Sequence, residues 1–414
     1  MSKTERRSLM PIIVQKYGGT SLANADLIKS VASRILNTKK RGFNVVVVCS
    51  AMGDSTDRLI SLAKEITDHP NPRELDVLLS TGETLVCPLV ALALEEIGCR
   101  AISLTRIQAG IKTESRFGRA RISDIDPVRI HQEIVDGKVV VVAGFQGVTD
   151  EQEITTLGRG GSDTTAVALS ASLEAIRCEI FTDVEGIFTA DPRIVPNAKK
   201  IPEIDYEEML ELAIVGAKMQ PRSIELGAIY QIPILVTSSF TDTSGTMIHE
   251  EVNVELSNRV RGVAYDSNVA KITLKSVPDR PGIAASLFEP LADVGISVDT
   301  IVQNTGSGDM TDLSFTISRS DLGLALETIT PIAKMNGALN VHHESELSKV
   351  SIVGTGMQNA PGFAARMFRA LAEAKINIDM ITTSEIRITC IVREEKVKEA
   401  VSILHETFEL DQED

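Results

Sequence analysis

The hydrophobic positions between residues 11 and 246 follow two alternating patterns. Short continuous apolar runs, rich in β-branched residues, are typical of strands that are buried on both faces of a sheet. Longer stretches with apolar side chains at helical spacing lie between them. Strands that alternate with helices predict βαβ units and a mostly parallel sheet in an α/β domain. The predicted strands are Ile12–Lys16, Val45–Cys49, Val139–Ala143, Glu179–Thr182 and Ile232–Val236, and the predicted helices include Ala25–Lys39, Thr84–Ile97 and Thr164–Ala175.

An internal repeat follows this domain. Residues 277–301 have the sequence VPDRPGIAASLFEPLADVGISVDTI, and residues 357–381, offset by 80 positions, have MQNAPGFAARMFRALAEAKINIDMI. The density of identical positions indicates a duplication, and each copy is predicted to fold as strand, Pro-Gly turn, helix, strand, strand and helix. The predicted elements are Lys271–Ser276, Ile283–Asp293, Ser297–Gln303, Thr311–Ile317 and Asp321–Lys334 in the first copy, and Lys349–Gly354, Phe363–Ala374, Asn377–Thr383, Ile386–Val392 and Lys396–Thr407 in the second.

These patterns predict the domain boundaries. Residues 11–246 form the first domain, and the polar stretch Thr241–Glu255 marks the linker region. The repeats occupy residues 270–345 and 346–414. Residues 247–269 are assigned to the linker and an extra strand, because Arg259–Tyr265 has a strand pattern. The second copy has little chain left for a fourth strand, so we expect this segment to complete its sheet.

Composition narrows the function classes. Lys and Arg number 42 and Asp and Glu 57 among 414 residues, so the formal net charge of −15 argues against binding to nucleic acid or an anionic membrane. The five Cys are scattered without a C-x-x-C and the six His are scattered too, which disfavours a disulfide framework and a zinc site. No signal-peptide pattern is present and no apolar run approaches the ~20 residues of a membrane span, so we expect a soluble, cytoplasmic protein.

Two glycine-rich loops at predicted strand ends carry candidate chemistry, although the usual G-x-x-x-x-G-K-[ST] and G-x-G-x-x-G loops are absent. In Lys16–Ser21, KYGGTS, two glycines let backbone N–H groups approach an anion, and Lys16 adds a positive charge. The alternative is a tight turn with a surface lysine. In Leu157–Asp163, LGRGGSD, the exposed guanidinium of Arg159 can hold a carboxylate with two hydrogen bonds. Asp163 could cap the following helix, pair with a lysine, or do both.

Two further loops also follow predicted strands. Ser50–Thr56, SAMGDST, places hydroxyls at the carboxyl edge of a parallel sheet, where open α/β folds bind ligands. Its alternative role is a helix cap by Ser55 or Thr56. Thr182–Arg193, TDVEGIFTADPR, mixes an aromatic side chain, carboxylates and an arginine, as a purine and phosphate pocket would.

Together these segments resemble the aspartate kinases of the amino-acid kinase superfamily. KYGGTS, CSAMG, STGE, TLGRGGSDTTA and TDVEGIFTADPR occur in that family's order and spacing, and the duplicated region resembles the paired ACT domains of its feedback-regulated members. The resemblance implies a mostly parallel sheet between helix layers, followed by two α+β, ferredoxin-like ACT repeats. It also implies transfer of the γ-phosphate of MgATP to the side-chain carboxylate of L-aspartate. The product, 4-phospho-L-aspartate, is the first intermediate toward lysine, threonine and methionine.

The same resemblance assigns roles to individual residues. It implies that Asp163 orients Lys16, that Arg159 clamps the α-carboxylate of aspartate and that Glu83 holds its ammonium group. Mg²⁺ is expected to arrive mainly on the nucleotide phosphates, so no metal ligand is assigned. The implied catalytic residues are Lys16, Gly18, Gly19 and Asp163; the implied aspartate-binding residues are Ser50, Thr56, Glu83, Arg159 and Ser162; the implied ATP-binding residues are Lys16, Gly19, Ser21, Thr182, Asp183, Phe188, Asp191, Arg193 and Lys218.

Two features depart from the family pattern. Phe188 stands where many members have tyrosine, which removes any hydroxyl contact there. The segment Gly216–Arg222 is one residue shorter than usual between Lys218 and Arg222, a shift that turns later side chains on a helix by about 100°. Without the resemblance, Glu83 is predicted to be a solvated helix residue and Lys218 a surface charge.

The ACT-like repeats predict regulation. Backbone N–H groups at the helix start after each Pro-Gly turn suit the carboxylate of a free amino acid, here lysine, threonine or both. Exposed sheet edges favour pairing between repeats or subunits, so we expect a homo-oligomer with effector sites at ACT–ACT interfaces. Met247 could start a separate regulatory chain. The candidate effector-binding residues are Asp279, Gly282, Ala284, Gln303, Asn304, Asn377, Ile378 and Thr382.

Other functions stay open at this point. Another amino-acid kinase, acting on glutamate or acetylglutamate, is disfavoured by the paired repeat. A catalytically silent amino-acid sensor predicts a degraded catalytic set, whereas Lys16, Arg159 and Asp163 are all present. The repeats could also serve only to hold an oligomer together.

Overall fold

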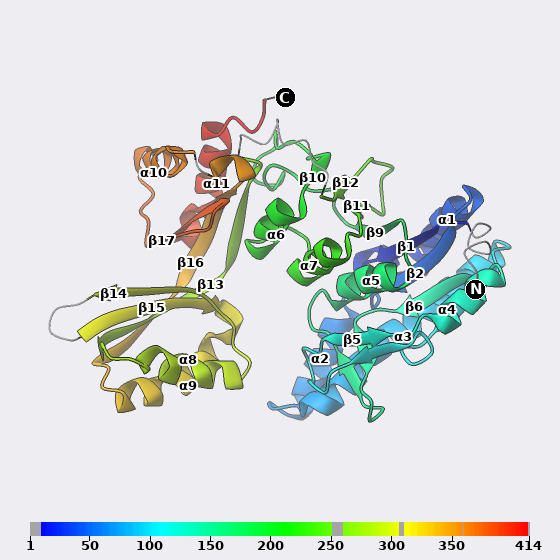
Figure 1. Ribbon diagram of the computed structural model, residues 1–414, viewed down its shortest axis with the longest axis horizontal. Coiled ribbons are helices and arrows are strands. Elements are labelled where there is room, and N and C mark those ends of the chain that lie inside the picture. Colours follow the sequence, from blue (N-terminus) through cyan, green and yellow to red (C-terminus); the bar gives the residue numbers. More distant parts are fainter. Residues whose placement is uncertain (1–9, 251–259, 306–309, 359, 413–414) are drawn as a thin grey trace. The chain divides into compact units, whose positions relative to one another are not determined.

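The computed structural model describes residues 10–250, 260–305, 310–358 and 360–412. The chain divides into two compact units, whose elements are labelled in Figure 1. The first unit comprises Met1–Ile187, Lys200–Ile214 and Lys218–Asn253. The second comprises Phe188–Lys199, Val215–Ala217 and Val254–Asp414. Two short segments that the sequence pattern assigned to the first domain therefore pack with the second unit.

An eight-stranded sheet organises the first unit, in the order β10-β12-β11-β9-β1-β2-β6-β3. All of the pairs from β11 to β3 are parallel, which confirms the predicted mostly parallel sheet. The central strands are almost wholly buried because helices cover both faces. The strands are β1 (Ile12–Tyr17), β2 (Asn44–Cys49), β3 (Ala101–Leu104), β6 (Val139–Ala143), β9 (Arg177–Thr182), β10 (Glu203–Ile204), β11 (Ile234–Ser238) and β12 (Thr246–Ile248).

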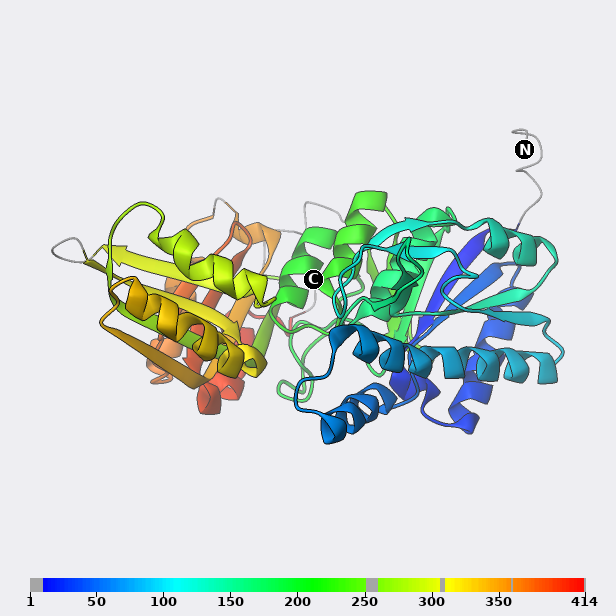
Figure 2. The ribbon, with the colours of Figure 1, turned by 90° about the horizontal axis from the view of Figure 1, so that it is seen from below.

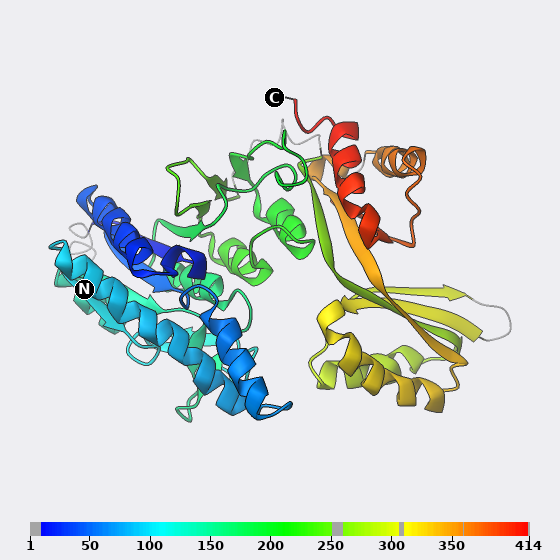
Figure 3. The ribbon, with the colours of Figure 1, turned by 180° about the vertical axis from the view of Figure 1, so that it is seen from behind.

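Helices lie on both faces of this sheet. α1 (Ala25–Lys40) and α3 (Pro72–Glu96) lie side by side over one face, as Figure 3 shows, and α2 (Ser55–Ile66) packs against α3. α5 (Gly161–Ser172) covers the other face, where it contacts β1, β2 and β9. The remaining helices are α4 (Val128–Val135), α6 (Tyr206–Ile214) and α7 (Pro221–Tyr230).

A second, smaller sheet in the first unit was not predicted. Its order is β5-β4-β7-β8, formed by β4 (Ile111–Thr113), β5 (Ile122–Ile125), β7 (Gln146–Val148) and β8 (Ile154–Thr156). Strands this short show no hydrophobic period along the sequence. Their importance is positional, because β8 leads directly into the glycine-rich loop that carries Arg159.

Helix α3 is longer than its apolar pattern predicted. It begins at Pro72 rather than Thr84, with Asn71 as its N-cap, and runs along the first unit as one continuous helix (Figure 2). By length and composition it could cross a membrane, contrary to the expectation that no apolar run approaches that size. Core helices of soluble proteins pass the same test, and α3 buries Asp76 and Glu83 in hydrogen bonds to loops of its own unit.

The second unit contains one six-stranded sheet, in the order β14-β15-β13-β16-β18-β17. Two long central strands, β13 (Gly262–Pro278) and β16 (Asn340–Val353), are shared by both repeats (Figure 1). The pairing of Gly262–Tyr265 with the end of β16 confirms the predicted extra strand, although Arg259 lies outside the described residues. The outer strands are β14 (Val298–Thr305), β15 (Met310–Ser318), β17 (Met380–Thr383) and β18 (Arg387–Arg393).

Each repeat has its own hydrophobic core in this unit. α8 (Ile283–Asp293) and α9 (Leu322–Met335) pack with β13 and β15 around Phe315, which is fully buried. α10 (Phe363–Glu373) and α11 (Val397–Thr407) pack with β16 and β18 around Met367 and Leu404. The helix–strand order of each repeat is the predicted one, which confirms two α+β modules.

Two boundaries differ from the sequence prediction. The stretch taken as linker contains β12, which pairs with β11 and β10. The Thr246 hydroxyl also donates to the carbonyl of Ile201 at 2.6 Å. Residues 188–199 join the second unit, since Ala190 and Val195 are buried in the core of the second repeat. A short-range pattern cannot predict either contact.

Candidate active site

Lys16 and Asp163 form an ion pair at the carboxyl edge of the main sheet. Lys16 lies near the end of β1, and its Nζ is 2.6 Å from Oδ1 of Asp163 in the first turn of α5. The two side chains are only 12% and 14% exposed. The N-cap of α5 is Gly160, at φ +72°, and Asp163 makes no capping hydrogen bond. Of the two roles considered for Asp163, helix capping and pairing with a lysine, the structure therefore shows the pairing with lysine.

Gly19, in the turn after Lys16, allows two loops to pack backbone against backbone. A Cβ added to Gly19 would lie 2.8 Å from the carbonyl oxygens of Ala51 and Gly53. The Gly53 N–H donates to the Gly19 carbonyl at 2.9 Å, and the Ser50 N–H donates to the Tyr17 carbonyl at 3.1 Å. The KYGG turn and the SAMG loop are thereby fixed side by side, and a Cβ added to Gly18 would lie 3.6 Å from Nζ of Lys16.

Glu83 is a buried carboxylate rather than the solvated residue predicted from its local sequence. It is 3% exposed on α3, and Oε1 accepts a hydrogen bond from the Ala51 N–H at 3.1 Å. Oε2 is buried and has no hydrogen-bond partner in the described part of the chain. Burial raises the pKa of Glu83 to about 7, an effect only partly offset by hydrogen bonds from backbone N–H groups.

The remaining predicted aspartate-binding residues lie in the first unit. Arg159 is exposed between Gly158 and Gly160, and no ion pair involves its guanidinium among the residues that the structure describes. Ser162 is 7% exposed, and a Cβ on Gly144 would lie 2.9 Å from its Oγ. Thr56 is half-buried in the first turn of α2, where neither it nor Ser55 caps the helix.

The first half of the predicted nucleotide loop joins Lys218. Nζ of Lys218 is 2.9 Å from Oδ2 of Asp183, and the Thr182 hydroxyl donates to Oδ1 of Asp183 at 3.1 Å. The shortened spacing before Arg222 therefore does not take Lys218 away from this loop. Partial burial acts to raise the pKa of Asp183, but the hydrogen bond and charge of Lys218, together with the hydrogen bond from Thr182, outweigh it and lower this pKa.

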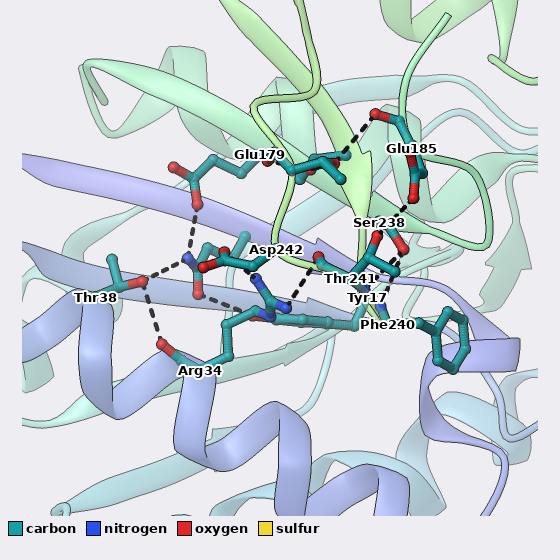
Figure 4. Close-up of polar contacts among 12 residues, drawn as sticks. Tyr17, Arg34, Thr38, Glu179, Glu185, Ser238, Phe240, Thr241 and Asp242 are labelled. Atoms are coloured by element: carbon teal, nitrogen blue, oxygen red, sulfur yellow. Dashed lines mark hydrogen bonds and ion pairs between the residues drawn. The ribbon is translucent and has the colours of Figure 1, made fainter.

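A polar network on the other face of β1 holds β9 and its following loop (Figure 4). Gln15 donates through Nε2 to Oε2 of Glu179 at 2.7 Å and to the Thr38 hydroxyl at 3.0 Å. Tyr17 stacks on Phe181, and the Arg34 guanidinium lies 5.3 Å from the centre of that ring. The same picture shows Thr241 beside Glu185, whose Oε1 accepts from the threonine hydroxyl at 3.1 Å. Next to this network, the Ser21 hydroxyl donates to Ser239 at 2.7 Å.

The second half of the nucleotide loop belongs to the second unit. The Thr189 hydroxyl is 2.9 Å from Nε2 of His405 on α11, and the Thr189 carbonyl accepts from the Val263 N–H at 2.7 Å. Arg193 pairs with Asp191 at 2.6 Å, and Asp191 also accepts from the Tyr265 hydroxyl at 3.4 Å. Phe188, which is half-buried, begins this segment.

The predicted effector residues lie in both repeats of the second unit. Nε2 of Gln303 on β14 donates to Oδ1 of Asp279 at 3.3 Å, beside the start of α8. Gly282 adopts φ +89° as the N-cap of that helix, and Ala284 lies in its first turn. Asn304 pairs with Asp312 across the sheet. In the second repeat, Asn377 and Ile378 precede β17, and Thr382 lies on it.

Sequence reasoning missed the buried carboxylate of Asp76. It is 1% exposed and accepts hydrogen bonds from the N–H groups of Gly118 and Thr156 and from the Thr156 hydroxyl. Burial raises its pKa, and these hydrogen bonds oppose the shift. Its spacing was the available signal, because Asp76 and Glu83 are seven residues apart and lie on one face of the apolar helix α3.

Family comparisons match both units. The amino acid kinase family matches residues 11–238, and ACT domains match residues 272–333 and 350–408. The aspartokinase of Geobacillus stearothermophilus is 49% identical over 405 residues, which cover 98% of each chain. The aspartokinase of Corynebacterium glutamicum is 47% identical over 412 residues, again covering 98% of each chain.

Solved structures give the same picture. E. coli aspartokinase III in complex with aspartate and ADP, an R-state structure, aligns with a TM-score of 0.79 and 28% identity, over 96% of this chain and 99% of that one. The same enzyme in complex with lysine and aspartate, a T-state structure, aligns with a TM-score of 0.73 and 27% identity, again over 96% of this chain and 99% of that one.

Proposed function

This chain belongs to the aspartokinases of the amino acid kinase family, and on that premise we propose how its residues divide the work of phosphorylating aspartate. The chain is an ATP-dependent kinase that transfers the γ-phosphate to the side-chain carboxylate of L-aspartate, giving 4-phospho-L-aspartate and ADP. The observation that carries the proposal is the Lys16–Asp163 ion pair between the two glycine-rich loops.

The chemistry requires charge compensation rather than a general base. The attacking aspartate carboxylate is already ionised at neutral pH, so one of its oxygens bonds to phosphorus as the bond to the ADP oxygen breaks. The barrier is the approach of two anions, which positioning and positive charge lower. Lys16 supplies that charge to the transferring group. The Gly18 N–H already donates to the Phe181 carbonyl at 3.2 Å, so of the two glycines we assign the backbone contact with the phosphate to Gly19. Asp163 fixes the direction of the Lys16 side chain.

Aspartate recognition uses the two ends of the substrate. The exposed Arg159 guanidinium pairs with the α-carboxylate, and Glu83 receives the α-ammonium group at its unpaired Oε2. Ser50, Thr56 and Ser162 add hydroxyl contacts. Because burial holds the pKa of Glu83 near 7, an approaching ammonium group favours its ionised form.

ATP binding is placed at the loop after β9. In this proposal the ATP phosphates lie beside Lys218, Thr182 and Asp183, which are joined by hydrogen bonds. Ser21 and Gly19, from the KYGG turn, complete this part of the site. Mg²⁺ would arrive on the nucleotide phosphates as MgATP, and we assign no residue of the chain as its ligand. The assignment of Phe188, Asp191 and Arg193 to the nucleotide stays a prediction from the motif.

A hydroxamate assay tests this function. Purified protein is incubated with MgATP, hydroxylamine and one of L-aspartate, L-glutamate or N-acetyl-L-glutamate. Hydroxylamine traps an acyl phosphate product as a hydroxamate, which is detected by its colour. We expect hydroxamate to form with aspartate only. Hydroxamate formed mainly from glutamate or acetylglutamate identifies a different amino-acid kinase. No hydroxamate from any of them, with the protein folded, identifies an amino-acid sensor.

We propose that the second unit binds free lysine, threonine or both. Gln303 and Asn304 lie on β14 and Thr382 on β17, and these two strands are the edges of the six-stranded sheet. Pairing of such edges between copies would place effectors at ACT–ACT interfaces in a homo-oligomer. Thr189 and Asp191 follow Asp183 in the same loop and contact His405 and Tyr265 of the second unit, so we expect this loop to carry the effector response toward the nucleotide. We also propose that Met247 can start a separate regulatory chain. We further propose that the protein is located in the cytoplasm.

Effector titration checks this regulation. Lysine, threonine and their mixture are added to the kinase assay, and we expect at least one to lower the apparent affinity for substrate by about 5- to 150-fold. Asp279→Ala and Gln303→Ala should weaken that inhibition, because they remove side chains beside the start of α8. Asp293→Ala, an exposed change at the other end of the same helix, is the matched control. If no effector acts, the repeats are structural modules.

A further inference from the structure

Helix α3 connects the two loops to which we assign aspartate recognition. Glu83 accepts a hydrogen bond from the Ala51 N–H in the loop after β2, and Asp76, two turns earlier on the same face, bonds to the end of β8. The loop with Arg159 begins one residue after Thr156. One helix face therefore bears Glu83 and also contacts the segment that leads into the Arg159 loop.

Asp76 makes three hydrogen bonds and no ion pair in the described part of the chain. Oδ2 accepts from the N–H of Gly118 at 2.8 Å and from the N–H of Thr156 at 2.8 Å. Oδ1 accepts from the Thr156 hydroxyl at 2.7 Å. A carboxylate that is 1% exposed without a cation is costly to bury, so these donors must be held in place for it to persist.

These bonds fix the loop of residues 157–161 against the loop of residues 114–121. The Ala120 N–H donates to the Thr156 carbonyl at 2.9 Å. Arg222 bridges the two loops as well, since it donates to the carbonyl of Ala120 at 3.0 Å and to that of Leu157 at 3.4 Å. A Cβ on Gly158, at φ +81°, would lie 3.1 Å from the Gly118 carbonyl oxygen. The two loops thus pack too closely to shift independently.

We propose that Asp76 is a positioning residue that sets the place of the Arg159 guanidinium, and so the affinity for the α-carboxylate of aspartate. The inference rests on the proposed function, in which Arg159 binds that group. Asp76 touches no substrate in this scheme. It acts by holding Thr156 and Gly118, and its distance along α3 from Glu83 sets the separation between the carboxylate and ammonium subsites.

The test compares Asp76→Ala with Asp76→Asn in steady-state kinetics. The alanine variant leaves two N–H groups without an acceptor, so we expect the KM for aspartate to rise roughly tenfold or more while the KM for ATP changes less than about twofold. The asparagine variant keeps one oxygen that can accept from both N–H groups. The Thr156 hydroxyl can rotate to accept a hydrogen bond from the new side-chain NH₂ group. It should therefore restore the KM for aspartate to within a few-fold of the unmodified enzyme.

A double-mutant cycle with Arg159→Ala separates positioning from general destabilisation. If Asp76 acts through Arg159, then Asp76→Ala adds almost nothing to the aspartate KM in the Arg159→Ala background. Additive losses overturn the proposal, and so does an equal rise in the KM for ATP. Glu133→Ala, which removes a carboxylate 4% exposed on α4, is the control for loss of a buried charge and should leave the aspartate KM unchanged.

Thr156→Val keeps the proposal testable if Asp76→Ala does not fold. It removes only the hydroxyl donor to Oδ1, so a smaller rise of the aspartate KM is expected, and an unchanged KM contradicts the proposal. The assigned function fails in a different way. An Arg159→Ala variant with normal aspartate kinetics would remove Arg159 from recognition, whatever the Asp76 variants do.

Discussion

Replacement of Lys16 by alanine is expected to lower kcat by about 10²- to 10³-fold, the effect of removing one preorganised group that stabilises transition-state charge. Lys16 is 12% exposed and is held 2.6 Å from Asp163, so its ammonium group is desolvated and oriented before substrate arrives. An interaction made mainly in the transition state affects kcat more than KM. Initial rates at saturating aspartate and MgATP measure the change.

Two controls make the Lys16 result interpretable. Lys40→Ala removes an exposed lysine at the end of α1, on the opposite edge of the sheet, and should leave kcat unchanged. Lys16→Ala leaves the Asp163 carboxylate without its partner, so the double variant Lys16→Ala, Asp163→Asn tests whether that stranded charge causes the loss. Recovery of kcat in the double variant, or an unchanged kcat in Lys16→Ala, would remove Lys16 from the phosphoryl-transfer step.

Replacement of Arg159 by alanine should weaken aspartate binding while largely sparing ATP. Losing a charge-assisted contact with two hydrogen bonds costs roughly 2–5 kcal/mol, which corresponds to about 30- to 5,000-fold in kcat/KM for aspartate. The exposed side chain makes no ion pair within the described residues, so its loss strands no partner in the folded protein. Steady-state kinetics with each substrate varied in turn separates the two effects.

Arg159→Lys refines the same experiment. It keeps the charge but loses the paired geometry of the guanidinium, so we expect an intermediate loss. Arg41→Ala, at the exposed end of α1, is the matched surface control. A loss confined to ATP in Arg159→Ala would instead assign this arginine to the nucleotide site.

The strands and repeat elements with strong local patterns were predictable from the sequence. Val45–Cys49 and Val139–Ala143 are continuous apolar runs, and Ile12–Lys16 begins with one. Each coincides with a strand of the main sheet to within one residue at either end. Burial on both faces of a parallel sheet imposes that pattern along a few adjacent residues. Ile283–Asp293 was likewise predicted with its observed bounds, between a Pro-Gly turn and Gly295.

The burial of charged groups was decided by tertiary structure. Glu83 was predicted to be solvated, because nothing within a few residues of it provides the Ala51 N–H that it accepts. Asp76 escaped notice for the same reason, since its donors lie 42 and 80 positions away along the chain. Carboxylates are buried only where distant segments bring donors to them, and such pairings leave no local period.

Local patterns were enough to establish the α/β and α+β modules, the duplication and the loops that carry Lys16 and Arg159, and the family resemblance implied that Asp163 orients Lys16. Only the folded structure shows that ion pair itself, the pairing of Lys218 with Asp183 and the packing of residues 188–199 in the second unit. The physical reason is the range of the forces involved. Periodic burial and turn chemistry act over a few residues, whereas ion pairs and core packing depend on contacts that close loops of tens to hundreds of residues.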